Sequence, residues 1–202
     1  MREQIGTSCS NLPRGLTVAG DRAGARRTLL ALRAGIAPAQ RVAADEAIAA
    51  RLDAIVRALA PEVVGGYWPM RDEPELVAAF TRWHAAGIAV ALPRVVAAGV
   101  ALEFGRWEPG AALVQGPFRT LHPEPHRPVV PQLLVLPCVG FDRHCFRLGY
   151  GGGYYDRTLA AIPGARAVGV GYDECEIAEF PCEPHDRRLD WIVTQTRVLR
   201  PA

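Results

Sequence analysis

Residues 137–157 read PCVGFDRHCFRLGYGGGYYDR, and this stretch indicates the architecture of the whole chain. It follows a short apolar run, Leu133–Leu136, that ends at a proline as a buried parallel strand does. A charged loop and a glycine-rich turn come next, and residues 154–162 predict a helix that Pro163-Gly164 closes. A strand, a glycine-rich turn and a helix N-terminus together favour phosphate binding. Glycines let backbone N–H groups approach an anion, and the first helical turn has unpaired donors.

Arg147 stands just before the glycines and adds a forked guanidinium that can hold two phosphate oxygens at once. The turn contains neither G-x-G-x-x-G nor G-x-x-x-x-G-K-[ST], so it is neither a Rossmann dinucleotide fingerprint nor a Walker motif. The glycines alone therefore define no class of enzyme.

Outside this turn, the chain alternates between apolar runs and amphipathic stretches. Strands are predicted near residues 63, 88, 133, 167 and 191, and helices over 21–34, over a stretch that Pro38 opens and Pro61 ends, and from Pro74 to Gly87. Residues 94–108 predict a hairpin that turns at Ala98-Gly99. The proline-rich residues 109–131 lack a clear periodicity and are expected to wrap the surface or form a lid. The alternation predicts a single three-layer α/β domain with a mainly parallel sheet and helices on both faces.

Composition restricts the possible partners of the chain. Its 202 residues fit one domain, predicted over 21–202 and preceded by a polar extension over 1–20. A net charge of +2 predicts no nucleic-acid face. None of the apolar runs is long enough to predict a membrane span. Five cysteines without C-x-x-C spacing argue against a disulfide scaffold and favour a reducing, cytoplasmic setting. We expect a monomer. All 23 basic residues are arginine, which weakens the evidence from any single arginine.

Residues 141–156 carry a more specific signal than the glycines. They resemble the signature F-D-x-x-G-x-R-L-G-x-G-x-G-Y-Y-D of the 5-formyltetrahydrofolate cyclo-ligase family, also called 5,10-methenyltetrahydrofolate synthetases. The matching residues are Phe141, Asp142, Arg147, Leu148, Gly149, Gly151, Gly153, Tyr154, Tyr155 and Asp156. Cys145 departs from the signature, where the family usually has glycine. The resemblance extends, more thinly, from about Arg22 to the C-terminus and implies a Rossmann-like fold.

The resemblance implies ATP as a co-substrate and Mg²⁺ as a cofactor held by Asp156 and Asp186. The residues that it implies for ATP binding are Arg22, Arg26, Arg147, Leu148, Gly149, Tyr150, Gly151, Gly152, Gly153, Tyr154 and Tyr155. Arg147 and Tyr155 are also implied to be catalytic. Arg22 replaces a lysine of the family, while Arg26 matches its arginine. On spacing alone, a solvated arginine face is the simpler interpretation of this pair.

For the folate substrate, the resemblance implies contacts from Trp68, Glu73 and Tyr154. Trp68 and Glu73 follow a predicted strand, at the end where ligands of open parallel sheets bind. A carboxylate suits the paired N–H donors of a pterin ring. Without the resemblance, Glu73 is better interpreted as a first-turn glutamate favoured by a helix dipole. Residues 118–123 read FRTLHP where the family has aromatic-Gly-Ile-x-Glu-Pro, so substrate contacts from this segment are in doubt.

The activity that the resemblance implies is conversion of 5-formyltetrahydrofolate and ATP to 5,10-methenyltetrahydrofolate, ADP and phosphate. Two alternatives stay open from the residues. One is a folate- or nucleotide-binding paralogue without this turnover, which the departures at Arg22, Cys145 and residues 118–123 make conceivable. The other is a phosphate-handling enzyme of similar fold, such as a sugar-phosphate isomerase, which requires neither ATP nor magnesium.

Overall fold

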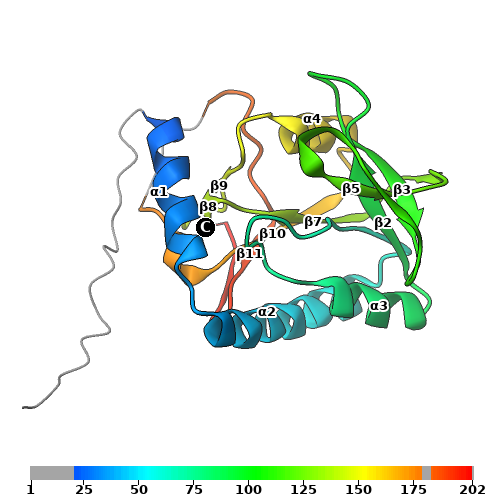
Figure 1. Ribbon diagram of the computed structural model, residues 1–202, viewed down its shortest axis with the longest axis horizontal. Coiled ribbons are helices and arrows are strands. Elements are labelled where there is room, and N and C mark those ends of the chain that lie inside the picture. The colour runs from blue at the N-terminus through cyan, green and yellow to red at the C-terminus, as the bar shows by residue number, and fades with distance from the viewer. Residues whose placement is uncertain (1–20, 179–182, 202) are drawn as a thin grey trace, which may run out of the picture.

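A computed structural model of the chain describes residues 21–178 and 183–201, so the predicted extension over 1–20 lies outside the described residues (Figure 1). The helical elements in chain order are α1 (Arg22–Ala34), α2 (Pro38–Leu59), α3 (Val77–Ala85), η1 (Pro117–Arg119), α4 (Tyr154–Ala161) and η2 (Asp173–Cys175). The strands are β1 (Val63–Gly65), β2 (Ala89–Arg94), β3 (Glu103–Trp107), β4 (Leu113–Gln115), β5 (Leu121–Pro123), β6 (Pro128–Val129), β7 (Leu133–Pro137), β8 (Gly140–Phe141), β9 (Arg147–Leu148), β10 (Arg166–Val170), β11 (Trp191–Val193) and β12 (Val198–Leu199).

The main sheet has eight strands in the order β12-β11-β10-β7-β1-β2-β3-β6. The adjacent strands from β11 to β2 run parallel, while β12, β3 and β6 are antiparallel to their neighbours. The five predicted strands form this parallel centre, so the prediction of a mainly parallel α/β domain is confirmed. The predicted hairpin is also confirmed, as β2 pairs with β3 across a turn at Ala98-Gly99.

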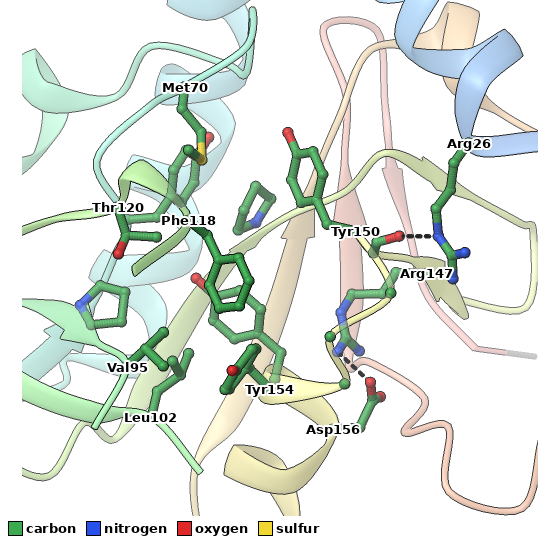
Figure 2. Close-up of a pocket in the computed structure, with 18 of the residues that line it drawn as sticks. Arg26, Met70, Val95, Leu102, Phe118, Thr120, Arg147, Tyr150, Tyr154 and Asp156 are labelled. Carbon is green, nitrogen blue, oxygen red and sulfur yellow. Dashed lines mark hydrogen bonds and ion pairs between the residues drawn. The ribbon is translucent and has the colours of Figure 1, made fainter. Parts of the chain in front are cut away.

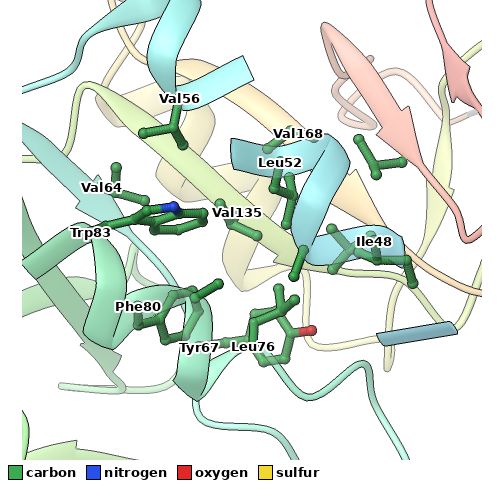
Figure 3. Close-up of a cluster of buried hydrophobic side chains, with 14 of the residues drawn as sticks. Ile48, Leu52, Val56, Val64, Tyr67, Leu76, Phe80, Trp83, Val135 and Val168 are labelled. Atoms are coloured by element: carbon green, nitrogen blue, oxygen red, sulfur yellow. The ribbon is translucent and has the colours of Figure 1, made fainter. Parts of the chain in front are cut away.

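Both faces of the sheet bury apolar side chains, because alternate residues of a strand point to opposite faces. Leu133 and Val135 of β7 pack in a cluster with residues of α2 and α3, shown in Figure 3. Leu134 and Leu136 pack in a second cluster, which Leu159 of α4 joins. In Figure 1, α2 and α3 lie along one side of the sheet and α4 along the other.

The helices largely follow the sequence pattern. Asp21 caps α1, where its carboxylate accepts a hydrogen bond from Gly24 N at 2.8 Å. The predicted start of α3 at Pro74 is wrong, because the helix begins at Val77. The Tyr67 hydroxyl donates to Pro74 O at 2.7 Å, which places this residue in a loop contact before the helix. In the described residues, no helix is long and apolar enough to cross a membrane.

Residues 109–131 contain more regular structure than their sequence indicates. β4 pairs with β5 in a separate two-stranded sheet, and β6 extends the main sheet beside β3. The short lengths of these strands and their prolines explain why no period was visible. Phe118 and Arg119 at the tip adopt left-handed φ values of 59° and 63°.

A tight turn between β8 and β9 positions Arg147. The buried Asp142 carboxylate accepts hydrogen bonds from His144 N at 2.9 Å and Phe146 N at 3.0 Å. Cys145 lies in this turn with a φ of 65°. Glycine adopts such a conformation without a steric cost, which gives a physical reason for the family's glycine at this position. Here a fully buried cysteine adopts it instead.

We expect Asp142→Ala to lower the free energy of unfolding by roughly 2–4 kcal/mol, because two backbone donors in a buried turn lose their acceptor. Asp142→Asn is the matched control, since it keeps the Oδ1 acceptor, and it should lose less stability than the alanine variant. Urea unfolding followed by circular dichroism measures both. An alanine variant as stable as the wild type would contradict this role for Asp142.

Candidate active site

A cavity of about 710 Å³ opens where β1, β2 and β7 end (Figure 2). Pro137 at the end of β7 lines one part of it, together with Tyr67, Trp68 and Val95 from the loops after β1 and β2. The glycine-rich turn over 149–153, the start of α1 and residues 183–186 line the rest. Ligands of parallel sheets bind at this edge, so the cavity lies where the sequence placed the site.

Arg147 and Asp156 form an ion pair in this cavity. Arg147 Nη2 lies 3.1 Å from Asp156 Oδ2, and the side chains are only 4% and 17% exposed. The guanidinium also lies over the Tyr155 ring, with Cζ 5.8 Å from the ring centroid. Burial raises the pKa of Tyr155, so this phenol stays protonated near neutral pH. The two predicted catalytic residues are therefore in contact.

Arg26 of α1 contacts the glycine-rich turn through its side chain. Its Nε donates to Gly149 O at 2.7 Å, and a Cβ atom at Gly151 would lie 3.2 Å from its Cζ. Gly151 has a φ of 97°, which other residues rarely adopt. Burial and the neighbouring Arg22 lower the pKa of Arg26 from its ordinary value, which leaves it charged near neutral pH.

Arg22 and Asp186 form a second ion pair at the mouth of the cavity, with Glu183 Oε1 3.6 Å from Arg22 Nη1. Partial burial raises the pKa of Asp186, but the hydrogen bonds from Arg22 and from Glu183 N outweigh it and hold this pKa below its ordinary value. The Arg187 amide, next in the chain to Asp186, donates to Asp156 Oδ1 at 3.1 Å. Both predicted metal-binding carboxylates therefore lie in one corner of the cavity.

These carboxylates fit a magnesium ion in their chemistry. Magnesium takes one or two protein carboxylates and completes its shell with water and substrate phosphates. Asp156 and Asp186 supply carboxylate oxygens that line the cavity. Each carboxylate pairs with an arginine, so a cation would compete with Arg147 and Arg22. Within residues 21–178 and 183–201 no cluster of three or more His, Cys, Asp or Glu side chains could hold a metal.

Glu73 also lines the cavity and belongs to a buried hydrogen-bonded cluster. Its Oε1 accepts from the Tyr150 hydroxyl at 2.8 Å, and its Oε2 accepts from Met70 N at 3.0 Å. The Tyr150 hydroxyl in turn accepts from Arg33 Nη2 at 2.6 Å. Burial raises the pKa of Glu73 to about 7, while these hydrogen bonds and Arg33 act in the opposite direction. Because α3 begins only at Val77, Glu73 is not a first-turn glutamate.

Aromatic side chains complete the lining. Trp68 packs against Trp107 at a centroid distance of 6.2 Å, and Tyr154 packs against Phe118 at 5.7 Å. Figure 2 shows Phe118 and Tyr154 beside Leu102 and Val95. This apolar side of the cavity is suited to flat ring systems.

Most predicted site residues line this one cavity. One predicted residue does not line it, and one residue of the Glu73 cluster was not predicted. The Leu148 side chain does not line it, because it is buried in a core cluster with Leu29 and Val139. Arg33 was missed, although it lies four residues after Leu29 on the buried face of α1. That spacing is the one signal for it, and a single buried arginine at an apolar position is easily taken for a solvated one.

Comparisons with known proteins identify the family of the chain. The sequence model of the 5-formyltetrahydrofolate cyclo-ligase family matches residues 18–195. The chain is 32% identical to the 5-formyltetrahydrofolate cyclo-ligase of Mycolicibacterium smegmatis over 184 residues, which cover 85% of this chain and 92% of that relative. It is 36% identical to the Escherichia coli K12 cyclo-ligase over 104 residues, or 48% of this chain and 57% of that relative.

A solved structure is similar over nearly the whole chain. The NMR structure of Aquifex aeolicus 5,10-methenyltetrahydrofolate synthetase has a TM-score of 0.77 at 26% identity, covering 89% of this chain and 92% of that one. The Mycoplasma pneumoniae synthetase has the same fold, with a TM-score of 0.72 at 21% identity over 87% of this chain and 99% of that one. On the family match and the extent of these similarities, the chain belongs to the 5-formyltetrahydrofolate cyclo-ligase family.

Proposed function

We propose that this cyclo-ligase transfers the γ-phosphoryl group of ATP to the formyl oxygen of 5-formyltetrahydrofolate and then closes the ring. Membership of the family carries the cyclo-ligase activity itself. The observation that supports the proposed route is the shared cavity, which the Arg147–Asp156 pair, the glycine-rich turn and Glu73 all line.

A formamide oxygen is a poor leaving group, and phosphorylation makes it a good one. The N10 nitrogen of the folate then attacks the activated formyl carbon, and phosphate departs as 5,10-methenyltetrahydrofolate forms. Phosphoryl transfer depends mainly on positioning and on cations around the moving group. Arg147, Arg26 and the backbone amides of residues 149–153 supply these charges and donors, with Arg22 at the outer end of the phosphate chain.

Magnesium would be held by Asp156 and Asp186, and it would neutralise phosphate charge. The folate would occupy the other end of the cavity. Each Glu73 oxygen accepts one hydrogen bond in the free protein and keeps a lone pair for the pterin donors. Trp68 and Tyr154 would pack against the rings.

Two of the departures from the family pattern are compatible with turnover. Cys145 and Arg119 replace family glycines, and both adopt the left-handed φ that glycine favours. The proposed site uses neither side chain.

We also include in this proposal the three-layer Rossmann-like arrangement, a cytoplasmic setting and a monomeric chain. The buried free thiols Cys138, Cys145 and Cys175 support a reducing setting.

The purified chain, mixed with 5-formyltetrahydrofolate, ATP and magnesium, should produce the near-ultraviolet absorbance of the methenyl product. Arg147→Ala should reduce kcat about a hundredfold, because one lost cation near the moving phosphoryl group removes roughly 3 kcal/mol of transition-state stabilisation. Arg166→Ala is the matched control, since it removes a half-exposed arginine outside the cavity. A folded wild-type chain that binds ATP but forms no product would favour the binding paralogue.

Glu73 should make folate binding depend on pH. Its pKa is about 7, so the carboxyl is largely protonated at lower pH and offers the pterin donors a poorer acceptor. The folate KM should therefore rise roughly tenfold from about pH 8 to about pH 6, with the ATP KM little changed. Glu73→Gln should raise the folate KM and abolish this dependence.

Glu75→Gln is the control, because Glu75 is exposed, does not line the cavity and accepts a hydrogen bond from Val77 N. It should retain the wild-type pH profile. A Glu73→Gln variant that changes the ATP KM and leaves the folate KM alone would place Glu73 at the nucleotide instead.

A further inference from the structure

Tyr150 belongs to the glycine-rich turn, yet its side chain belongs to the cluster around Glu73. The hydroxyl accepts from Arg33 at 2.6 Å and donates to Glu73 at 2.8 Å. Figure 2 shows Tyr150 pointing away from the Arg147–Asp156 pair. The family signature leaves this position open.

The backbone on both sides of Tyr150 is held at the nucleotide end of the cavity. Arg26 donates to Gly149 O at 2.7 Å, and its guanidinium lies against Gly151. Phosphates bound by Arg26 and by the amides of this turn would therefore act on the same few peptide units that carry the Tyr150 ring. A shift of these units moves the hydroxyl relative to Glu73.

The loop that carries Glu73 is held by contacts with Arg33 and Tyr150. Arg71 and Asp72 have φ values of 49° and 62°, a conformation that costs energy for residues other than glycine. Arg33 donates to Arg71 O at 2.8 Å and so helps to hold this strained turn. The Arg71 guanidinium lies 5.3 Å from the Tyr150 ring centroid. Tyr150 thus contacts the Glu73 loop through a hydrogen bond and a cation–π contact.

We propose that Tyr150 is a positioning residue that couples nucleotide binding to folate binding, by tying the glycine-rich turn to Glu73. This inference rests on the proposed function. A nucleotide that orders the turn also fixes the Tyr150 hydroxyl that donates to Glu73. Folate that binds afterwards has fewer groups to order, so its binding costs less conformational entropy. Coupling of this kind is reciprocal, and folate must tighten nucleotide binding by the same factor.

The hydroxyl also favours the ionised form of Glu73. The other groups that act on this carboxylate are Arg33 from α1, Arg71 and Met70 N from its own loop, and the Tyr67 and Tyr155 phenols. Both arginines and the amide remain when only the Tyr150 hydroxyl is removed. Tyr150→Phe should therefore move the pH midpoint of folate binding upward while keeping a dependence on pH.

The test measures the Kd of 5-formyltetrahydrofolate by calorimetry, with and without a non-hydrolysable ATP analogue and magnesium. In the wild-type chain we expect the analogue to tighten folate binding about fivefold or more. In Tyr150→Phe the factor should fall below about twofold, while each ligand alone still binds. Tyr172→Phe is the matched control, because it loses a tyrosine hydroxyl that bonds Asp45 at 2.6 Å, away from the cavity lining.

The result that overturns this inference is a coupling factor in Tyr150→Phe equal to that of the wild type, or no coupling in the wild type. Turnover of the wild type in the absorbance assay separates this outcome from failure of the proposed function. If the wild type forms methenyl product but Tyr150→Phe retains full coupling, only the role of Tyr150 is wrong. If the wild type neither binds folate nor forms product, both proposals are wrong.

Discussion

A guanidinium as buried as Arg147 requires a carboxylate beside it, and the rest of the site depends on this pairing. An unpaired buried charge costs several kcal/mol, and Asp156 at 3.1 Å supplies the opposite charge that offsets this cost. The pair connects β9 to the first turn of α4, so the chain between them must turn sharply. The glycines of residues 149–153 permit that turn, with φ values of 97° at Gly151 and 63° at Gly153. The arrangement that places a cation in the cavity thus also shapes the glycine-rich turn.

A second cluster of charges lies on the other side of the same turn. Arg33 and Glu73 are both almost fully buried, and the Tyr150 hydroxyl joins them. In the proposed reaction, one cluster would offer positive charge to phosphates and the other a carboxylate to pterin donors. The proposed route needs both substrates held at once, since the formyl oxygen would meet the γ-phosphate before N10 attacks. A turn shared by the two clusters is a direct way to align them.

The sequence predicted the features that depend on local pattern. Apolar runs near residues 63, 133 and 167 indicated the parallel strands, and the glycines after Arg147 indicated a turn before the helix at residue 154. The sequence did not predict contacts between distant residues. Arg33 meets Tyr150 across 117 positions, and only packing decides that this arginine is buried. The start of α3 was missed for a similar reason, because the Tyr67 hydroxyl binds Pro74 O in the loop before it. Leu148 matched the signature, but its side chain supports the core.

The central claim is that the formyl oxygen leaves as part of phosphate, and an isotope measurement tests it most directly. 5-Formyltetrahydrofolate labelled with ¹⁸O in the formyl group would be converted with ATP, and the released phosphate analysed by mass spectrometry. Transfer of the γ-phosphoryl group to that oxygen predicts that every phosphate formed carries one ¹⁸O atom. Unlabelled phosphate, with the label released as water, would show that ATP is hydrolysed without phosphorylating the folate and would contradict the account.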